Sequence, residues 1–178
     1  MCRGAVLWHV PHDNLADQNG SSVGARRMRL FYLWAQYAHT RNKGAKDPSF
    51  RIGPAIKIIT RHVVPGPSTR ALSLGARNMI EPGLLRAAGV GQVEAVDLFP
   101  QERGIRRADM ERLPYNSSTF DLCLASHSIE HSLNLEQAAR EIARVTRPGG
   151  YVWIAVPAGQ APDAHDRHRF DTILDVVD

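Results

Sequence analysis

Three aspartates lie at or near the ends of predicted strands in the second half of the chain. Asp97 and Asp109 each follow an apolar run, whereas Asp121 lies early inside the next run. In an open, doubly wound sheet, ligands bind beyond the carboxyl ends of the strands. Carboxylates at that edge accept hydrogen bonds from ribose hydroxyls and from the amino group of a base. We therefore predict that Asp97 and Asp109 bind a nucleoside, and that Asp121 is structural.

Gly75 points to the same kind of ligand. An apolar run ends at Gly75, and Asp97 follows 22 positions later, which is the spacing of a nucleotide-binding β-α-β unit. Arg77 and Met79 stand where the usual fingerprint has further glycines. The fingerprint is therefore only partly present. A nicotinamide-dependent oxidoreductase, which requires Gly-x-Gly-x-x-Gly, is the least favoured of the functions considered.

A polar cluster follows the fourth predicted strand, at the place where a substrate would meet a cofactor. It contains Ser126, His127 and His131, with Glu130 between the two histidines. The spacing differs from His-Glu-x-x-His and no third ligand follows at a suitable distance, so we predict no metal site. His127 is the candidate general base, because it directly follows the strand. His131 is expected to be packed or hydrogen-bonded at a helix start.

Alternating strand and helix patterns from residue 70 onward position these side chains. The predicted strands are 71–75, 93–97, 104–108, 120–126 and 151–156, and the predicted helices are 82–88 and 135–146. Strands rich in Val, Leu and Ile that alternate with helices predict an α/β fold, with a doubly wound, mostly parallel sheet covered on both faces. Asn134 and Gln137 predict a capping box at the start of the last helix, and Pro148-Gly149-Gly150 predicts its end.

Charge divides the 178-residue chain into two parts. Residues 1–69 hold ten Lys and Arg against three Asp and Glu, whereas residues 70–178 hold twelve against fifteen. We predict a basic, partly helical N-terminal extension (1–69) and a main domain (70–178). The extension would begin with a loosely packed leader and contain a helix at 26–39, which either caps a substrate, lies on a membrane surface or, as we favour, packs on the main domain. A basic extension attracts nucleic acid, acidic lipid or an anionic substrate, or is a solvated surface. We favour the solvated surface and do not expect nucleic acid.

The composition is that of an ordinary globular domain, with 43% hydrophobic and 22% charged residues. No apolar run is long enough to span a bilayer, and the apolar stretch at the start is too interrupted for a signal peptide. Cys2 and Cys123 provide neither a disulfide framework nor a metal-binding spacing. We predict a cytoplasmic protein in which Cys123 is a small core residue.

Five short motifs follow one another at close spacing in this half of the chain. They are Asp97-Leu-Phe-Pro100, Asp109-Met-Glu-Arg-Leu-Pro-Tyr115, Ser118-Thr-Phe-Asp-Leu122, His127-Ser-Ile-Glu-His131 and Arg144-Val-Thr-Arg-Pro-Gly-Gly150. This ordered set resembles the class I S-adenosylmethionine-dependent methyltransferases of the broad methyltransferase type 11 group, over roughly residues 70–157. The resemblance implies S-adenosylmethionine as the cofactor. It also implies methyl transfer to a nucleophilic atom of a small-molecule or sugar-like acceptor.

The resemblance implies roles for individual residues. The cofactor-binding residues would be Gly75, Ala76, Arg77, Asn78, Glu81, Asp97, Leu98, Asp109, Met110 and Ser126, and the catalytic residue would be His127. The loop at Gly75 would contact the methionine part of the cofactor through its backbone, and Asp97 would bind the ribose. Asp109 would accept a hydrogen bond from the adenine amino group, while Leu98 and Met110 would lie against the adenine.

The loop after the first predicted strand departs from the family pattern. Ser73 stands where the family usually has an acid, and Arg77 stands where it has another glycine. Arg77 either blocks close approach of the cofactor or pairs its planar guanidinium with the cofactor's carboxylate. Our hypothesis is that Glu81 replaces the missing acid. The alternative function is a non-catalytic cofactor-binding or interaction module of the same fold.

The family pattern continues beyond the fifth strand with a helix and two more strands, one of them antiparallel. Here residues 171–177 predict the start of that helix, and the sequence then stops. We expect either a fragment or a shortened form that leaves a sheet edge open. Such an edge would be covered by the N-terminal segment or by another chain, which would make the protein a homo-oligomer.

Overall fold

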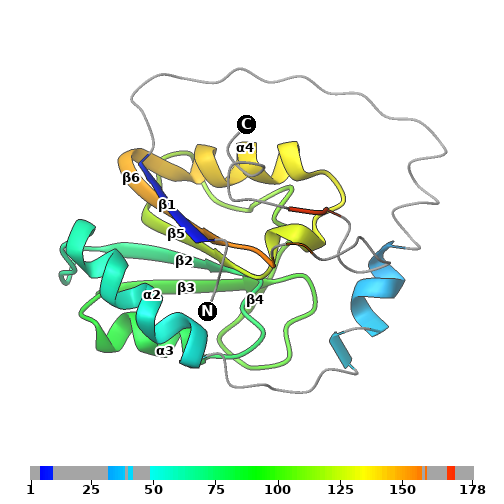
Figure 1. The fold of residues 1–178 in the computed structure, drawn as a ribbon, viewed down its shortest axis with the longest axis horizontal. Helices are drawn as coiled ribbons and strands as arrows, with labels where there is room; N and C mark the ends of the chain where they lie inside the picture. The colour runs from blue at the N-terminus through cyan, green and yellow to red at the C-terminus, as the bar shows by residue number, and fades with distance from the viewer. Residues whose placement is uncertain are drawn as a thin grey trace.

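A six-stranded sheet forms the centre of the structure, a computed structural model that describes residues 5–9, 32–38, 40–41, 49–157, 159 and 168–170. The strands are β1 (Ala5–His9), β2 (Arg70–Leu74), β3 (Gln92–Asp97), β4 (Arg106–Arg107), β5 (Phe120–Ser126) and β6 (Thr146–Ala155). Their order in the sheet is β1-β6-β5-β2-β3-β4 (Figure 1). Strands β2 to β6 are parallel to one another, and β1 pairs with β6 in the antiparallel direction. The predicted mostly parallel sheet is confirmed.

The strand order reverses between β2 and β5, in the middle of the sheet. The chain moves from β2 outward to β3 and β4 on one side, and from β5 outward to β6 on the other. Ligands of doubly wound sheets bind at this reversal, beyond the carboxyl ends of the strands. The fold therefore brings the loop at Gly75 and the polar cluster after β5 to the same place.

Helices cover both faces of the sheet. Helices α2 (Ser49–His62) and α3 (Ile80–Ala87) lie on one face, and α4 (Leu135–Val145) lies on the other, after the short 3-10 helix η1 (Ile129–His131) (Figure 1). Residues 32–38 and 40–41 are also helical, and we call them the N-terminal helical segment. None of the helices in the described part of the chain is long and apolar enough to cross a membrane.

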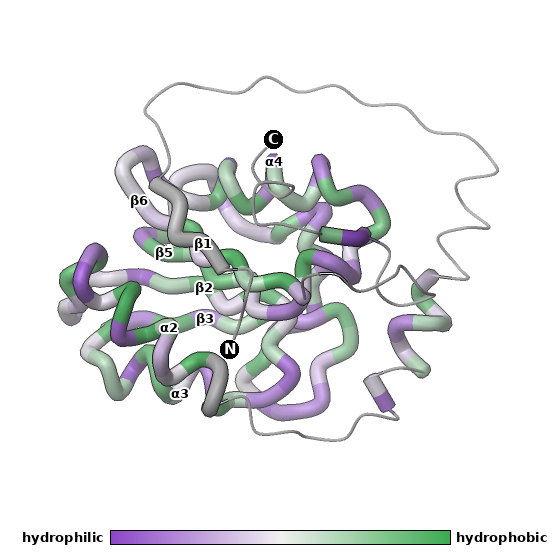
Figure 2. Tube along the Cα trace, viewed as in Figure 1, coloured by the Kyte–Doolittle hydropathy of each residue, from purple (hydrophilic) through white to green (hydrophobic). Residues whose placement is uncertain are grey.

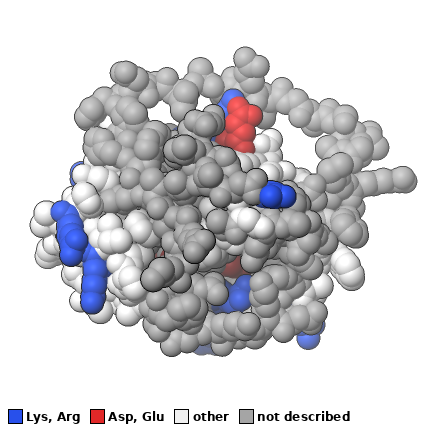
Figure 3. All heavy atoms as spheres, in the orientation of Figure 1, with Lys and Arg blue, Asp and Glu red and all other residues white. Residues whose placement is uncertain are grey.

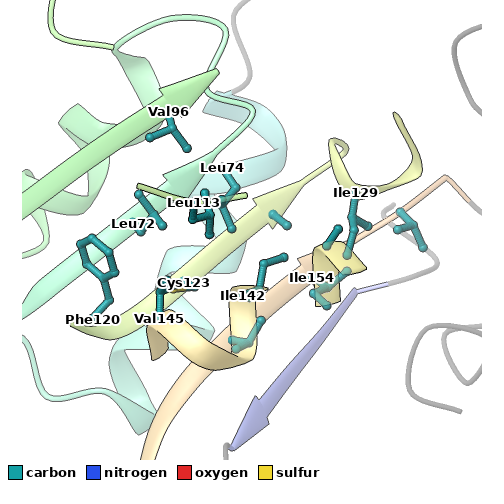
Figure 4. Packing of buried hydrophobic residues seen from close by; sticks show 14 of the residues in the cluster. Leu72, Leu74, Val96, Leu113, Phe120, Cys123, Ile129, Ile142, Val145 and Ile154 are labelled. Carbon is teal, nitrogen blue, oxygen red and sulfur yellow. The ribbon is translucent and has the colours of Figure 1, made fainter. Parts of the chain in front are cut away.

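Each face of the sheet has its own apolar core. Consecutive residues of β5 alternate between the two, because side chains of a strand point to opposite faces. Leu122 and Leu124 pack with α2 and α3, whereas Cys123 packs with Ile142 and Val145 of α4 (Figure 4). Figure 2 shows that apolar residues are frequent in the central strands β2 and β5. Burial of each large aliphatic side chain stabilises the fold by about 1.5–3 kcal/mol.

Strand β1 corrects the prediction that the leader is loosely packed throughout. Residues 5–9 pair with β6 in antiparallel register, from Ala5 opposite Ala155 to His9 opposite Tyr151. The pairing satisfies backbone groups that an open edge of β6 would leave exposed. Of the two expected covers for that edge, the N-terminal segment is the one found. The rest of the predicted leader, residues 1–4 and 10–22, lies outside the described residues, as does the predicted helix start at 171–177.

Helix α2 joins the N-terminal part of the chain to the main core. Ile52, Ile56 and Ile59 are buried against residues of the later part, among them Leu85 and Leu122. The predicted division at residues 69 and 70 therefore stays a prediction, since elements on both sides of it share one sheet and one core. Of the helix predicted at 26–39, residues 32–38 are helical, and the others lie outside the described residues.

The ends of α4 only partly follow the prediction. Asn134 Oδ1 accepts a hydrogen bond from the Gln137 amide at 3.0 Å, as predicted. The reciprocal half of the capping box is wrong: the Asn134 amide bonds to Glu111, and the Gln137 side chain donates to the Glu111 carbonyl. Helix α4 ends at Val145, within one residue of the predicted end at 146. The turn predicted at Pro148-Gly149-Gly150 is wrong, because these three residues lie within β6.

Asp121 has the structural role that its early position in the strand predicts. Its Oδ2 accepts a hydrogen bond from the Arg70 amide at 2.6 Å, and its Oδ1 lies 2.7 Å from Nε of Arg147. These contacts tie the starts of β2, β5 and β6 together at the edge of the sheet opposite the predicted site.

Candidate functional site

Gly75 forms the tight turn that follows β2. Its φ is +69°, a region that residues with side chains rarely adopt. A Cβ atom at Gly75 would lie 2.4 Å from Cβ of Ser128, which follows β5. The two loops therefore meet so closely that only glycine fits. The next residue, Ala76, donates its amide to the Val96 carbonyl at 3.0 Å, which anchors the loop to β3.

Glu81 places a carboxylate beside β2. The Ser73 hydroxyl donates a hydrogen bond of 2.6 Å to Oε1 of Glu81, and both side chains are buried. Burial raises the pKa of Glu81 to about 7, and the hydrogen bond from Ser73 opposes the rise. Although strand β2 carries no acid at Ser73, a carboxylate from α3 thus lies next to that position.

Asp97 and Asp109 are each held by their own loop. The Phe99 amide donates to Oδ1 of Asp97 at 2.7 Å, and the Glu111 amide donates to Oδ1 of Asp109 at 3.0 Å. Burial raises the pKa of Asp97, while the Phe99 amide and the charges of Arg77 and His131 lower it. Asp97 ends β3 and Asp109 follows the adjacent strand β4, so both carboxylates lie at the same edge of the sheet.

Arg77 and Asn78, the unusual pair of the loop, differ in their surroundings. Arg77 is half-buried, and its charge acts on Asp97. Asn78 is buried, and its Oδ1 accepts a hydrogen bond from the Ile80 amide at 3.2 Å, which fastens the start of α3. Arg77 thus contributes positive charge near the ribose position predicted from the sequence, whereas the described bond of Asn78 is structural.

The loop after β4 is tied to the start of α4 by Glu111. Its Oε1 accepts hydrogen bonds from the amides of Leu133 and Asn134, the latter at 3.0 Å. Glu111 is buried, although it lies in a loop. Leu98 and Met110, the residues predicted to lie against an adenine, are half-buried in the loops after β3 and β4. The two loops are therefore held at neighbouring positions of one edge.

His127 directly follows β5, in backbone strained by a φ of +51°. Its amide donates to the Ala155 carbonyl at 2.7 Å, which holds the residue at the end of β6. Its Nδ1 lies 3.9 Å from Oε1 of Glu130, whose side chain is buried. The pair places an imidazole, a group that can accept a proton, beside a carboxylate. Ser126, half-buried, precedes it at the end of the strand.

Ser128 is a site residue that the sequence reasoning did not identify. Its side chain is buried, and its Oγ has no hydrogen-bond partner among the described residues. An unpaired buried hydroxyl costs about 1–3 kcal/mol, so a polar ligand group beside Gly75 would be stabilised here. The only signal in the sequence was a polar residue in the cluster after β5, because its contact with Gly75 depends on the fold. Among the described residues, no group of three His, Cys, Asp or Glu side chains is arranged to hold a metal ion.

Known proteins that are similar to this chain indicate its class. Residues 74–154 match the family described as a methyltransferase domain. The chain is 36% identical over 100 residues to malonyl-[acyl-carrier protein] O-methyltransferase of Halorhodospira halophila, covering 48% of this chain and 34% of that protein. It is 35% identical over 83 residues to the ubiquinone/menaquinone biosynthesis C-methyltransferase UbiE of Bdellovibrio bacteriovorus, covering 39% of this chain and 35% of that protein. The chain thus spans about a third of the length of these two relatives.

A solved structure shows the same fold over most of the chain. It is 1,6-didemethyltoxoflavin-N1-methyltransferase of Burkholderia thailandensis, with a TM-score of 0.65 and 19% identity, covering 90% of this chain and 78% of that one. Residues 74–154 therefore match a methyltransferase domain, and the comparisons support the class I S-adenosylmethionine-dependent methyltransferases as its class. The predictions of this family, of its α/β fold and of S-adenosylmethionine as the cofactor of the class are confirmed.

Proposed function

We propose that this chain binds S-adenosylmethionine and transfers its methyl group to a small-molecule or sugar-like acceptor. The observation that carries the proposal is the pair of carboxylates on adjacent strands. Asp97 and Asp109 each have one oxygen held by a backbone amide, at 2.7 and 3.0 Å, which fixes the orientation of the carboxylate. Two such acceptors after β3 and β4 suit the ribose hydroxyls and the adenine amino group of a nucleoside.

The loop at Gly75 suits the methionine end of the cofactor. The amino-acid tail carries an ammonium and a carboxylate, and the loop offers partners of both kinds. Glu81, held beside Ser73, provides a carboxyl group in place of the usual strand acid, and an ammonium beside it would favour its charged form. The half-buried guanidinium of Arg77 and the unpaired hydroxyl of Ser128 provide donors for the carboxylate. The residues present therefore fit the cofactor, including at the two positions that depart from the family pattern.

His127 is the proposed general base. When bound, S-adenosylmethionine supplies a methyl group that is activated by its positively charged sulfur. The acceptor nucleophile must lie in line with that methyl group, and fixing this alignment removes much of the entropic barrier. If the nucleophile carries a proton, His127 takes it up, and Glu130 at 3.9 Å stabilises the resulting imidazolium. A nucleophile without a proton needs only the alignment.

A non-catalytic module of the same fold is the alternative function. The observation that favours it is Arg77 at a position where the family has glycine, since a bulky side chain there restricts the approach of a ligand. In that case the chain binds the cofactor or a partner without transferring a methyl group. The proposal also includes the cytoplasmic location predicted from the sequence. It further holds that the acceptor is a small molecule and not a nucleic acid.

Calorimetric titration of the purified chain with S-adenosylmethionine, S-adenosylhomocysteine and NAD tests the proposal. We expect both sulfur nucleosides to bind with micromolar affinity and NAD not to bind. A second assay offers the chain a panel of small phenols, amines and sugars and uses mass spectrometry to detect loss of the methyl group from the cofactor. This assay distinguishes a methyltransferase from a non-catalytic module. Binding of neither sulfur nucleoside would refute the proposal. Binding without turnover of any acceptor would favour the module.

A further inference from the structure

A hollow of about 380 Å³ lies beside the ribose edge of the site. Its lining comes from the N-terminal helical segment and from the loop and strand that follow β3, and consists of Tyr37, Thr40, Arg41, Phe99, Pro100, Gln101 and Arg107. None of the residues predicted to bind the cofactor lines it. Leu98, which does belong to that set, is the neighbour of Phe99 in the chain. The hollow is therefore adjacent to the cofactor position but separate from it.

Aromatic rings and guanidinium groups alternate along this hollow. The rings of Tyr37 and Phe99 meet edge to face, with centroids 5.5 Å apart. The guanidinium carbon of Arg41 lies 5.7 Å from the centroid of Tyr37, and that of Arg107 lies 5.6 Å from the centroid of Phe99. Stacking of this kind holds each guanidinium in place without using its N–H groups, which can then donate hydrogen bonds.

Hydrogen bonds fix the two sides of the hollow against each other. Gln101 Nε2 donates to the Thr40 carbonyl at 3.0 Å, which joins the loop after β3 to the N-terminal helical segment. Arg41 Nη1 donates to the Tyr37 hydroxyl at 3.1 Å, within the segment. A hydrogen bond and a ring contact therefore join the two sides, and these contacts fix the shape of the hollow.

The charged side chains that line the hollow are positive. Among the described residues, its lining contains two arginines and no acid. The nearest acid along the chain, Glu102, is directed elsewhere, since its Oε2 accepts a hydrogen bond from the Met79 amide at 2.9 Å. On the face shown in Figure 3, the visible charged side chains are mostly Lys or Arg, and the acidic ones gather mainly near α4. Asp97 is the cross-strand partner of Arg107, but its Oδ1 accepts the Phe99 amide and it does not line the hollow. Two guanidinium groups in the lining attract an oxyanion.

We propose that this hollow binds a small aromatic molecule that carries a phosphate or carboxylate group. The oxyanion lies between Arg41 and Arg107, and the ring stacks on the half-exposed side chain of Tyr37, which is 44% exposed. A volume of about 380 Å³ accommodates a molecule of this size, whereas a bilayer surface would not enter it. The proposal assigns the basic N-terminal extension a binding role toward an anionic small molecule.

Ligand-observed NMR on the full chain at low ionic strength provides the test. The probes are phenyl phosphate, inorganic phosphate and benzyl alcohol, which present the ring and the anion together or one at a time. We expect phenyl phosphate to bind about ten-fold more tightly than either of the others. Arg41→Gln and Arg107→Gln should each weaken its binding about ten-fold. The matched control is Arg61→Gln, an exposed charge at the end of α2 near the opposite edge of the sheet, which should change binding less than two-fold.

Three results would overturn the inference. The first is phenyl phosphate binding no better than benzyl alcohol, and the second is Arg61→Gln weakening its binding as much as Arg107→Gln does. The third is binding of anionic phospholipid vesicles with the same arginine dependence and no binding of phenyl phosphate, which would assign the arginines to a membrane surface. Titration of each variant with S-adenosylhomocysteine separates this inference from the proposed function, because the affinity should stay within two-fold of the unchanged chain. If the unchanged chain bound phenyl phosphate through these arginines but no sulfur nucleoside, the proposed function would fail and the inference would stand.

Discussion

Replacing Gly75 by alanine tests whether the turn after β2 is as tightly constrained as the structure indicates. The φ of +69° costs a residue with a side chain about 1–2 kcal/mol. The new Cβ would lie 2.4 Å from Cβ of Ser128, far inside the roughly 3.5–4.0 Å contact distance of two carbon atoms. Overpacking of this kind costs about 1–3 kcal/mol. We therefore expect Gly75→Ala to lower the free energy of unfolding by about 2–5 kcal/mol in urea titrations.

Two further variants make this measurement specific. Gly83→Ala in α3 is the matched control, because no atom lies within 4 Å of its added Cβ, and alanine there should stabilise by about 0.5–1 kcal/mol. Ser128→Gly in the Gly75→Ala background removes the overlap but not the strain at positive φ. It should therefore restore about 1–3 kcal/mol and no more. A Gly75→Ala variant as stable as Gly83→Ala would refute the reasoning.

Other predictions concern the buried acids and the core. Because the pKa of Glu81 is raised to about 7 in the folded chain, the folded state holds a proton that the unfolded state loses near its ordinary value of 4.5. Stability should therefore fall as pH rises from about 5 to 7, by about 3 kcal/mol, and Glu81→Gln should remove this slope in urea titrations at each pH. Glu111→Gln should weaken the tie to α4, lowering the free energy of unfolding by about 1 kcal/mol and the affinity for S-adenosylhomocysteine a few-fold. Ile142 is buried under the sheet, and Ile142→Ala should lower the free energy of unfolding by about 2–5 kcal/mol. The affinity of the folded variant for S-adenosylhomocysteine should not change.

Local sequence patterns were sufficient to predict the elements whose stability depends on near neighbours. The apolar run at β5 gave both ends of the strand, and Asn134 gave the first turn of α4. The spacing from Gly75 to Asp97 predicted the β-α-β unit that β2, α3 and β3 form. In each case the signal lies within a short stretch of chain, because apolar runs and helix caps act locally.

Features that depend on distant contacts could not be predicted in the same way. Strand β1 is as long as β2, but it forms because β6 offers an unpaired edge, which residues 5–9 alone do not reveal. Glu111 caps α4 from 23 residues away, which no local capping pattern reveals. The contact of Ser128 with Gly75 requires the strand order of the whole sheet. The bond between Ser73 and Glu81 lies between these two cases. The sequence suggested that Glu81 replaces the strand acid, but only the fold shows that its side chain meets Ser73.

The affinity of S-adenosylhomocysteine for Asp97→Asn tests the central claim most directly. If Asp97 accepts the ribose hydroxyls, removing its charge should weaken binding about ten-fold or more in calorimetry, without unfolding the chain. Glu136→Gln is the control, since its side chain is exposed on α4 and its ion pair with Arg140 is at the surface. The account predicts a large loss for Asp97→Asn and none for Glu136→Gln. Equal affinities in the two variants and the unchanged chain would contradict it.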